Sequence, residues 1–559
     1  MGELMLSGTP ASPGVALGTA WRPDETTTAT PPGSADQERE RAFEALAAAA
    51  QALSALAESL PPDEAAIIEA GALMAGDPAL LDAVEKTIES DGLAAADAII
   101  RATGEYADAI AAIDDETLAA RADDVRSLGR RAARLTGERA VASPRGEDLI
   151  LIAGDLGPAD VAEFAHSLAG VALAGGAATA HAAIVARSLG LPMITGADPR
   201  VLEVGDGTPV AIDGSSGTLI VSPSSDSASA AAAAMSSRRL AAKRAHELRD
   251  RPAVTTDGTR VTVLVNVASR EELEVGVRAG AEGTGLVRTE LAFLEADHWP
   301  TEREHLRALD PILDWLAGRP AVIRVLDFGA DKSPPFLHGT SQRGLDLLLT
   351  HTSALIDQLR AILRRAERHD VRILLPMVDA PEQVTAVRGL ITNLAGQLGV
   401  GTLPLVGSMI ETPAAAEHAP AIVRESDFLS IGTNDLTATT LGADRFASNG
   451  ARAYHPKVLR SIARSVMAAH DAKQLIEVCG EAASDPTMLP LLIGLGVDEL
   501  SVGAARVGEV RSWIRKLSAA EAGGLARSAL TMDTAEEVEW AARTLASELR
   551  SGNHTSVAA

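Results

Sequence analysis

The sequence predicts a multidomain α/β protein: a small α/β domain that carries an inserted helical bundle, followed by a closed (β/α)8 TIM barrel. Three observations lead to this fold class. The chain has 559 residues, which is too long for one domain and suggests about three or four. Residues 36–138 contain few Gly or Pro and place apolar side chains at helical spacing. Residues 252–550 alternate eight short apolar runs with helical stretches.

The composition describes an acidic protein with aliphatic cores. Apolar residues make up 46% of the chain and aromatic residues only 3%, so the cores must consist of Ala, Val, Leu and Ile. The formal net charge of −26 argues against nucleic acid as a partner, because a polyanion would be repelled. Cys479 is the only cysteine, so no intrachain disulfide can form, which fits a reducing cytoplasm. No segment has the pattern of a secretory signal or a membrane span, and we expect a cytoplasmic protein without membrane contact.

The N-terminal half combines two patterns. A turn and a short apolar stretch occupy residues 1–22, and short apolar runs between Gly-rich turns return at 146–222. We predict that these two segments form one α/β domain and that a bundle of about four helices, at 23–145, is inserted between them. A Ser-rich stretch and an exposed helix then predict a helical linker at 223–251.

Eight strand-like runs define the predicted C-terminal domain at residues 252–550. Eight β/α units over about 290 residues match the count and size of a closed barrel, which is favoured over the alternative of an open doubly wound sheet. We expect residues 551–559 to form a disordered tail. The eight runs lie at 261–267, 284–287, 321–326, 372–378, 405–410, 427–431, 475–479 and 499–502.

Polar side chains gather where the predicted strands end, which is where barrel enzymes place their catalytic groups. A single polar residue there is commonly a surface cap, but several arginines, carboxylates and an Asn on one rim are harder to explain in that way. Arg binds phosphate oxygens in a bidentate manner and keeps its charge, and carboxylates suit Mg²⁺, which also binds substrate phosphate. The pattern indicates a site for a phosphate ester and a divalent metal. Its polar residues include Arg288, Arg324, Glu411, Asn434, Asp435 and Arg445.

Two further residues allow a chemical and a purely structural interpretation. Cys479 ends the seventh run, where a thiol is commonly a small buried apolar group but could instead deliver a proton. His181 follows a run of small residues at the start of an apolar helix. A His beside an Ala-rich helix is more often structural, but the free N–H groups of a helix N-terminus would also stabilise a phosphoryl group on the imidazole. The combination with a remote phosphate-ester site favours the chemical interpretation of His181.

Several motifs resemble Enzyme I, the phosphoenolpyruvate–protein phosphotransferase of the bacterial sugar phosphotransferase system, over nearly the whole chain. The barrel motifs are highly specific together, whereas the motif around His181 also occurs in pyruvate phosphate dikinase. The matching segments are an N-terminal signature at 11–14, a bundle segment at 121–126, the phosphohistidine motif at 179–192 and barrel motifs at 286–290, 411–414, 430–437 and 478–481.

The resemblance implies a reaction, a cofactor and partners. Such a protein moves the phosphoryl group of phosphoenolpyruvate onto its own His, releases pyruvate, and passes the group to the histidine-containing phosphocarrier protein (HPr), as the first step of phosphoenolpyruvate-dependent sugar uptake. The phosphohistidine domain would swivel, the bundle would dock the carrier, and the barrel would form a homodimer. The implied roles are phosphoryl acceptor for His181, proton donor to enolpyruvate for Cys479, substrate binding for Arg288, Arg324, Asn434 and Arg445, and Mg²⁺ binding for Glu411 and Asp435.

Some positions depart from the family pattern. They lose hydroxyl or charged groups near His181 and the barrel site, or a carrier-contacting His in the bundle. These positions are Gly71, Gly157, Ala159, Ala178, Ala180 and Asp346. They motivate the alternative of a non-catalytic regulatory paralogue, although the barrel keeps its substrate-binding and metal-binding groups. Another phosphoenolpyruvate enzyme, such as the dikinase or phosphoenolpyruvate synthase, would also need an ATP-binding domain of roughly 200 residues with a phosphate-gripping loop, whereas a helical bundle precedes His181 here.

Overall fold

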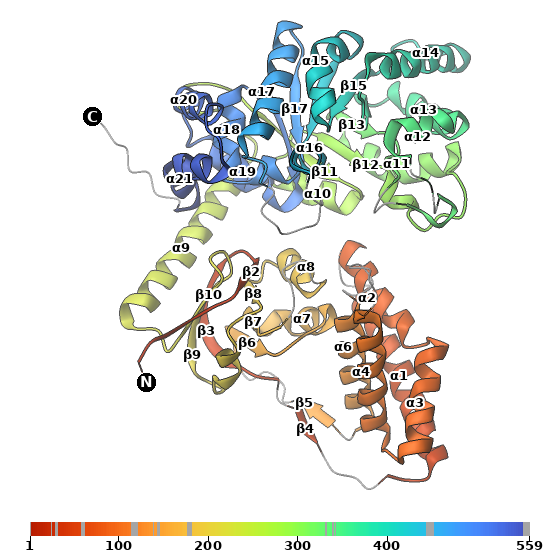
Figure 1. Cartoon of the computed structure of the whole chain (residues 1–559), viewed down its shortest axis with the longest axis vertical. Coiled ribbons are helices and arrows are strands. Elements are labelled where there is room, and N and C mark those ends of the chain that lie inside the picture. The colour runs from red at the N-terminus through yellow and green to blue at the C-terminus, as the bar shows by residue number, and fades with distance from the viewer. Residues whose placement is uncertain are drawn as a thin grey trace. The chain divides into compact units, whose positions relative to one another are not determined.

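The computed structural model describes most of the chain (Figure 1). The chain divides into two compact units, Met1–Ser237 and Arg238–Ala559. Ala178, Ala180 and Arg445 lie outside the described residues, as does the predicted tail from 552 onward. The structure describes residues 2–23, 25–27, 32–57, 62–112, 121–137, 139–141, 146–175, 181–329, 333–337, 340, 342–442 and 452–551.

An eight-stranded mixed sheet forms the α/β body of the first unit, in the order β1-β10-β9-β3-β6-β7-β8-β2. β3 pairs in parallel with β6, so the chain leaves the body after β3 and returns beside it. The predicted insertion of a helical bundle into an α/β domain is therefore confirmed. The elements of the body are β1 (Leu4–Ser7), β2 (Thr9–Ser12), β3 (Val15–Trp21), β6 (Leu149–Ala153), α7 (Pro158–Phe164), β7 (Leu168–Leu173), α8 (His181–Ser188), β8 (Met193–Thr195), β9 (Pro209–Asp213) and β10 (Thr218–Val221).

The return of the chain to the body depends on a glycine. A Cβ atom on Gly18 of β3 would lie only 1.9 Å from the carbonyl oxygen of Asp148. Asp148 itself has a left-handed φ of 57°, which is uncommon for a residue other than Gly. Its carbonyl accepts a hydrogen bond from the Thr19 N–H (3.2 Å). Any side chain at position 18 would therefore push the two strands apart.

The inserted bundle has five helices in its described part, one more than the approximate number predicted. One of them, α3, starts separately from α2 because Asp77 caps it and Pro78 occupies its first position. A two-stranded ribbon of β4 (Glu25–Thr27) and β5 (Arg139–Val141) flanks the bundle in the chain. The helices are α1 (Ala35–Ala57), α2 (Pro62–Met74), α3 (Pro78–Asp91), α4 (Ala95–Ala111) and α6 (Ala122–Leu135).

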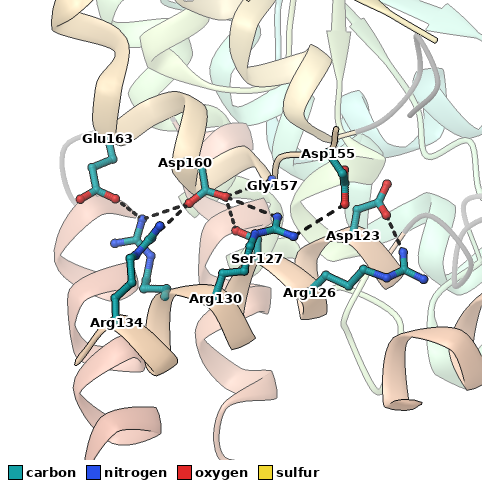
Figure 2. Close-up of polar contacts among 10 residues, drawn as sticks. Asp123, Arg126, Ser127, Arg130, Arg134, Asp155, Gly157, Asp160 and Glu163 are labelled. Atoms are coloured by element: carbon teal, nitrogen blue, oxygen red, sulfur yellow. Dashed lines mark hydrogen bonds and ion pairs between the residues drawn. The ribbon is translucent and has the colours of Figure 1, made fainter. Parts of the chain in front are cut away.

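A buried carboxylate joins the bundle to the α/β body (Figure 2). Asp160 of α7 accepts hydrogen bonds from the Ser127 hydroxyl (2.7 Å) and the Gly157 N–H (3.2 Å). Arg130 and Arg134 of α6 approach the same carboxylate at 3.8 and 3.5 Å. Burial alone would raise the pKa of Asp160, but the guanidinium charges hold it below its ordinary value. The charge on Asp160 therefore fixes α6 against α7.

Gly157 permits this close contact between the two helices. A Cβ atom at position 157 would lie 2.4 Å from the Cβ of Ser127. Gly157 is one of the departures from the family pattern, which has a hydroxyl residue there. A hydroxyl group is nevertheless present at this point of the fold, because Ser127 supplies one from α6.

The second unit contains a closed barrel of eight parallel strands, as predicted. β11 pairs with β12 on one side and with β18 on the other, which closes the ring. Outward-facing Val, Leu and Ile side chains of the strands pack under the surrounding helices in one large core. The strands are β11 (Thr262–Val267), β12 (Thr284–Arg288), β13 (Ala321–Arg324), β14 (Val371–Leu375), β15 (Leu405–Ile410), β16 (Phe428–Gly432), β17 (Ile476–Cys479) and β18 (Glu499–Gly503).

Helices follow the barrel strands in the chain and surround them (Figure 1). Within the described ranges, no helix is both long enough and apolar enough to cross a bilayer. α9 (Ser225–Glu247) follows β10, inside the segment predicted as a helical linker. The other helices are α10 (Arg270–Arg278), α11 (Glu302–Leu316), α12 (Gly344–Thr350), α13 (Thr352–Ala366), α14 (Pro381–Leu398), α15 (Pro413–Glu425), α16 (Thr433–Leu441), α17 (Pro456–Asp471), α18 (Met488–Leu495), α19 (Val507–Ile514), α20 (Ala519–Ala529) and α21 (Ala535–Ser551).

Two barrel strands end earlier than the apolar pattern predicted. β13 stops at Arg324, and Asp327 turns back to form an ion pair with that guanidinium (2.8 Å). β14 stops at Leu375, and Met377 has a left-handed φ of 51°, which a strand cannot contain. Such a conformation is strained for a side chain of this size and commonly marks a functional site. Both departures therefore lie at the carboxyl rim of the barrel.

We expect Asp160→Asn to destabilise the first unit by about 3–5 kcal/mol at neutral pH, because the partly buried guanidinium groups of Arg130 and Arg134 would face a neutral amide. The pKa of Asp160 is lowered in the folded chain, so its contribution is complete above the unfolded pKa of about 4. That contribution is lost as the pH falls through the lower folded pKa. Calorimetric melting of wild type and variant should differ most at pH 7 and converge in acid.

Asp155→Asn is the matched control in the same cluster. Burial raises the pKa of Asp155, and the nearby charge of Asp123 raises it further. Removal of its charge should leave the melting temperature unchanged or raise it. Equal losses from both substitutions would contradict the conclusion that the charge on Asp160 holds the two helices together.

Candidate active site

Two arginines lie side by side at the carboxyl ends of neighbouring strands. Arg288 ends β12, Arg324 ends β13, and the two are partners in the register of the parallel pair. The buried Arg324 binds Glu290 (2.5 Å) and Asp327 (2.8 Å) through its two Nη groups. Arg288 is half-buried and forms no ion pair with any residue that the structure describes. The rim thus has one fixed cation and one that remains available to an anion.

Arg324 is held in its charged state. Burial works against the charge, but the carboxylates of Asp327 and Glu290 outweigh burial and raise the pKa of the guanidinium above its ordinary value. The Nε–H of Arg324 has no hydrogen-bond acceptor in the described part of the chain. A buried guanidinium with a spare donor is suited to bind phosphate or carboxylate oxygens.

A buried amide on α13 fixes the ends of both arginine strands. Gln358 donates from Nε2 to the Thr289 hydroxyl (2.9 Å) and accepts from the Leu326 N–H (2.8 Å). The Thr289 hydroxyl in turn donates to the carbonyl of Arg324 (2.8 Å). One side chain therefore ties together the backbone that directly follows Arg288 and the backbone that follows Arg324.

Three carboxylates approach one another across the rim. Glu411 follows β15, is buried, and accepts a hydrogen bond from the Met377 N–H (2.8 Å). Burial and the nearby Asp327 raise the pKa of Glu411 to about 8, with Asp435 adding to the effect and Arg324 opposing it. A divalent cation would relieve this repulsion, so the carboxylates of Glu411 and Asp435 fit the role of Mg²⁺ ligands.

These carboxylates provide only part of a coordination shell. No three His, Cys, Asp or Glu side chains come together as a metal-binding group in the described ranges. Mg²⁺ commonly keeps several waters and is bound by one or two carboxylates together with substrate oxygens. The donor set at this rim matches that incomplete kind of site and not a closed protein cage.

The turn after β16 brings the sixth strand end close to Glu411. A Cβ atom on Gly432 would lie 2.6 Å from Glu411 Oε1, so only glycine permits this approach. Gly432 also precedes the first turn of α16, which contains Asn434 and Asp435. The Gly-Thr-Asn-Asp sequence therefore places a carboxylate and an amide beside Glu411.

Neighbouring loops hold the two α16 residues in place. The Asp435 carboxylate lies 3.5 Å from Nη1 of Arg343, the residue before α12. The Asn434 side-chain oxygen accepts a hydrogen bond from the Glu481 N–H (3.2 Å), just after β17. Both side chains are thereby oriented at the rim by loops that follow other strands.

Cys479 lies inside the barrel at the end of β17. Its thiol is 2% exposed and packs among Leu, Met, Val and Phe side chains. The Ser430 hydroxyl donates a hydrogen bond to Cys479 Sγ (3.4 Å). Burial, together with the nearby Glu477, raises the pKa of the thiol to about 12. Cys479 is therefore a neutral thiol at physiological pH and still carries its proton.

His181 lies in the first unit, at the first residue of α8. Its Nδ1 is 3.0 Å from the carboxylate of Asp124, which belongs to the first turn of α6. Arg121 approaches the same carboxylate oxygen at 3.4 Å. The contacts of Asp160 with the arginines of α6 hold that helix against α7. They therefore also set the position of Asp124, which contacts the imidazole.

The structure brings together most of the predicted site residues. All the described barrel residues of the prediction occupy the carboxyl ends of strands or the turns that follow them. Arg445 lies outside the described residues, and His181 belongs to the other unit. The residues at the barrel rim are Arg288, Arg324, Glu411, Asn434, Asp435 and Cys479.

Four contributing residues had no predicted role. Glu290 ends the 286–290 motif and Asp327 directly follows the predicted strand run at 321–326, so their places after strands indicated the rim. Gln358 sits within a helix and Asp124 within the bundle, far from their partners in the sequence. Only the folded structure reveals those two contacts.

Three parts of the chain match the sequence families of the domains found in phosphoenolpyruvate-utilising enzymes. The N-terminal domain matches residues 7–121, the mobile domain 145–217, and the phosphoenolpyruvate-binding domain 242–519. Together with the barrel rim, these matches define the class of protein as an enzyme that uses phosphoenolpyruvate.

Comparison with individual related proteins shows which family of these enzymes the chain belongs to. The chain is 32% identical over 564 residues to a phosphoenolpyruvate–protein phosphotransferase of Geobacillus stearothermophilus, with 96% of this chain and 97% of the relative covered. It is 31% identical over 559 residues to that of Bacillus subtilis, covering 95% and 98%. It is 38% identical over 496 residues to a multiphosphoryl transfer protein of Rhodobacter capsulatus, covering 85% of this chain but 59% of that longer relative. The chain belongs to the phosphoenolpyruvate–protein phosphotransferase family.

We expect Gln358→Met to raise the KM for phosphoenolpyruvate by about tenfold, because it removes both hydrogen bonds that hold the arginine strand ends. Loss of buried hydrogen bonds costs about 1–3 kcal/mol, and 1.4 kcal/mol corresponds to tenfold in affinity. Steady-state kinetics would measure the effect. Gln397→Met, at an exposed position of α14, is the control and should leave KM unchanged. Equal KM values for the two variants would show that Gln358 does not position the site.

Proposed function

We propose that this chain transfers the phosphoryl group of phosphoenolpyruvate to His181, releases pyruvate, and passes the group to the histidine-containing phosphocarrier protein. In the cell this would be the first step of phosphoenolpyruvate-dependent sugar uptake. The observation that carries the proposal is the buried, permanently charged Arg324 beside the crowded carboxylates of Glu411 and Asp435. That combination suits an anionic substrate bound together with a divalent cation.

In this proposal the barrel rim binds and orients the substrate. Arg288 and Arg324 hold the phosphate, and the Asn434 amide adds a hydrogen bond. Arg445, which follows the 430–437 motif in the sequence, is proposed as a further phosphate ligand because of the resemblance to the family. Glu411 and Asp435 would hold Mg²⁺, which supplies charge neutralisation to the phosphate and carboxylate oxygens when it is bound.

Cys479 is proposed to protonate the leaving enolpyruvate. When the phosphorus–oxygen bond breaks, the enolate must gain a proton on its methylene carbon to become pyruvate. The raised pKa keeps the Cys479 thiol protonated and ready to donate. Its position at the end of β17, at the same rim as the arginines, supports this role.

The contact with Asp124 supports His181 as the acceptor. A carboxylate can only accept, so Nδ1 of His181 carries the proton in this contact. Nε2 then presents its lone pair as the nucleophile. Because a phosphoryl group on Nε2 leaves the Nδ1 contact intact, Asp124 would orient the ring both before and after transfer.

The partner, the oligomeric state and the compartment are part of the same proposal. The carrier would dock on the bundle, where Leu73 of α2 is 79% exposed close to Gly71. The barrel would form a homodimer, and exposed apolar side chains such as Met467 and Trp540 offer surface for it. We place the protein in the cytoplasm, in line with its lone, buried cysteine.

Phosphorylation of His181 tests the central claim. With phosphoenolpyruvate labelled in its phosphate and with Mg²⁺, the full chain should acquire an acid-labile label, and His181→Ala should acquire none. His166→Ala is the matched control, because His166 is an exposed His in the same α/β body. Absence of label in the wild type would favour a non-catalytic paralogue. Persistent label in His181→Ala would place the acceptor elsewhere.

We expect Glu411→Gln and Asp435→Asn each to abolish turnover and to weaken Mn²⁺ binding, measured by electron paramagnetic resonance, by at least about tenfold. Each substitution keeps the side-chain shape but removes one anionic ligand. Glu417→Gln, on the exposed face of α15, serves as the control and should bind Mn²⁺ as the wild type does. Unchanged Mn²⁺ affinity in either of the first two variants would remove that residue from the metal site.

A further inference from the structure

A buried carboxyl group in the barrel has no part in the proposed reaction so far. Glu477 of β17 is 1% exposed, and neither of its carboxyl oxygens has a hydrogen-bond partner in the described part of the chain. Burial and the nearby Glu499 raise its pKa well above the ordinary value, although Arg372 and the adjacent Ser501 hydroxyl oppose the rise. Burial therefore favours the protonated, neutral form of Glu477, because an isolated ionised carboxylate in such a place would be very costly.

The strand geometry places this acid next to the thiol of Cys479. Residues two apart on a strand point to the same face, so Glu477 and Cys479 both face the barrel interior. On the neighbouring β16, Ser430 is the register partner of Glu477. The Ser430 hydroxyl donates to Cys479 Sγ (3.4 Å). The Ser430 hydroxyl, which can give one proton and take another, is therefore hydrogen-bonded to the thiol and belongs to the residue that pairs with Glu477 across the two strands.

Ser430 and Glu477 lie side by side on neighbouring strands, and this row of residues continues across β17 to β18. Glu499 of β18 is the register partner of Glu477. Glu499 accepts from Nη1 of Arg372 (3.4 Å), whose side chain retains 15% exposure. These residues lie nearer the amino ends of their strands than Cys479 does. The row thus runs from the thiol towards the end of the barrel opposite the substrate rim.

Other groups also lie close to Glu477 in the barrel interior. The Ser501 hydroxyl is beside it but donates to Asn266 Oδ1 (2.6 Å). Gly285 makes room for the carboxyl group, because a Cβ there would lie 2.1 Å from Glu477 Oε1. The titratable groups that face Glu477 are Cys479, Glu499 and Arg372.

We propose that Glu477 returns a proton to Cys479 through the Ser430 hydroxyl after each turnover, an inference that rests on the proposed function of Cys479 as the proton donor. Every forward turnover leaves a Cys479 thiolate that is buried among apolar side chains. In the return step the O–H bond of Glu477 breaks and the S–H bond of Cys479 forms, while Ser430 takes one proton and gives its own. Glu477 becomes a carboxylate and regains a proton from water by way of Glu499.

Separation of the first turnover from later ones tests this proposal. The full-length Glu477→Gln variant keeps a neutral side chain of the same shape but cannot give and retake a proton. In rapid-quench experiments with enzyme in excess, it should form its first pyruvate within about twofold of the wild-type rate, because Cys479 still holds its proton. With excess phosphoenolpyruvate and the phosphocarrier protein as acceptor, steady-state turnover should fall at least about tenfold.

Two serine variants complete the design. Ser430→Ala should likewise keep the rate of the first turnover and lose rate in later turnovers. This variant provides the test if Glu477→Gln does not fold. Ser408→Ala is the control, because Ser408 is equally buried but bonds to Ser426 away from the row. Wild-type steady-state rates in Glu477→Gln and Ser430→Ala overturn the proposal. The proposal is also overturned if these two variants lose the same factor in rate in the first turnover and in later ones. That result would indicate that the residues only pack the barrel interior.

Cys479→Ala distinguishes this proposal from the function on which it rests. Under the proposed function it should slow even the first turnover. A normal first turnover in Cys479→Ala would remove the thiol from the reaction. A slow first turnover there, together with an unaffected steady state in Glu477→Gln, would leave the function standing and reject only the proton path.

Discussion

The burial of one arginine charge governs the layout of the barrel site. Arg324 ends its strand with almost no exposure, so its guanidinium must be compensated by protein carboxylates. Glu290 and Asp327 provide this compensation, and Asp327 in turn crowds Glu411. The early end of β13 follows from the same requirement, because the chain must turn for Asp327 to reach Arg324. The fixed cation and the crowded carboxylates are thus two consequences of a single buried charge.

In the first unit, too, one buried charge determines how the neighbouring elements are placed. Asp160 holds the bundle helix α6 against the α/β body through its interactions with arginines. The first turn of α6 carries Asp124, which contacts His181. The orientation of the imidazole therefore depends on an ion cluster in a different part of the helix. An inserted bundle can in this way also position the histidine of its host domain.

Much of the fold and most of the barrel site were predictable from the sequence, for a local reason. The eight strands form short apolar runs, and residues such as Arg288 and Glu411 directly follow them, so chain order reports their place on the rim. The same reasoning fails where a contact joins distant segments. Gln358 lies in an ordinary helical pattern, and the 121–126 motif that contains Asp124 indicates only a bundle helix. Neither sequence context points to Thr289 or His181. The left-handed Met377 was missed because an apolar residue after a strand is indistinguishable from the strand itself.

In the proposed mechanism the barrel uses different groups to bind its substrate and to supply protons. The carboxyl rim concentrates positive charge from Arg288 and Arg324 and carboxylates for a cation, which favours binding of an anion but offers few groups able to release a proton. The thiol of Cys479 at the end of β17, and the hydroxyl of Ser430 and the carboxyl group of Glu477 further along their strands, are all buried, and burial favours the neutral form of the thiol and of the carboxyl group. Neutral proton carriers can occupy a low-dielectric interior at far lower cost than ions. A barrel that binds a highly charged substrate at one end can therefore keep its exchangeable protons in the apolar layer beneath.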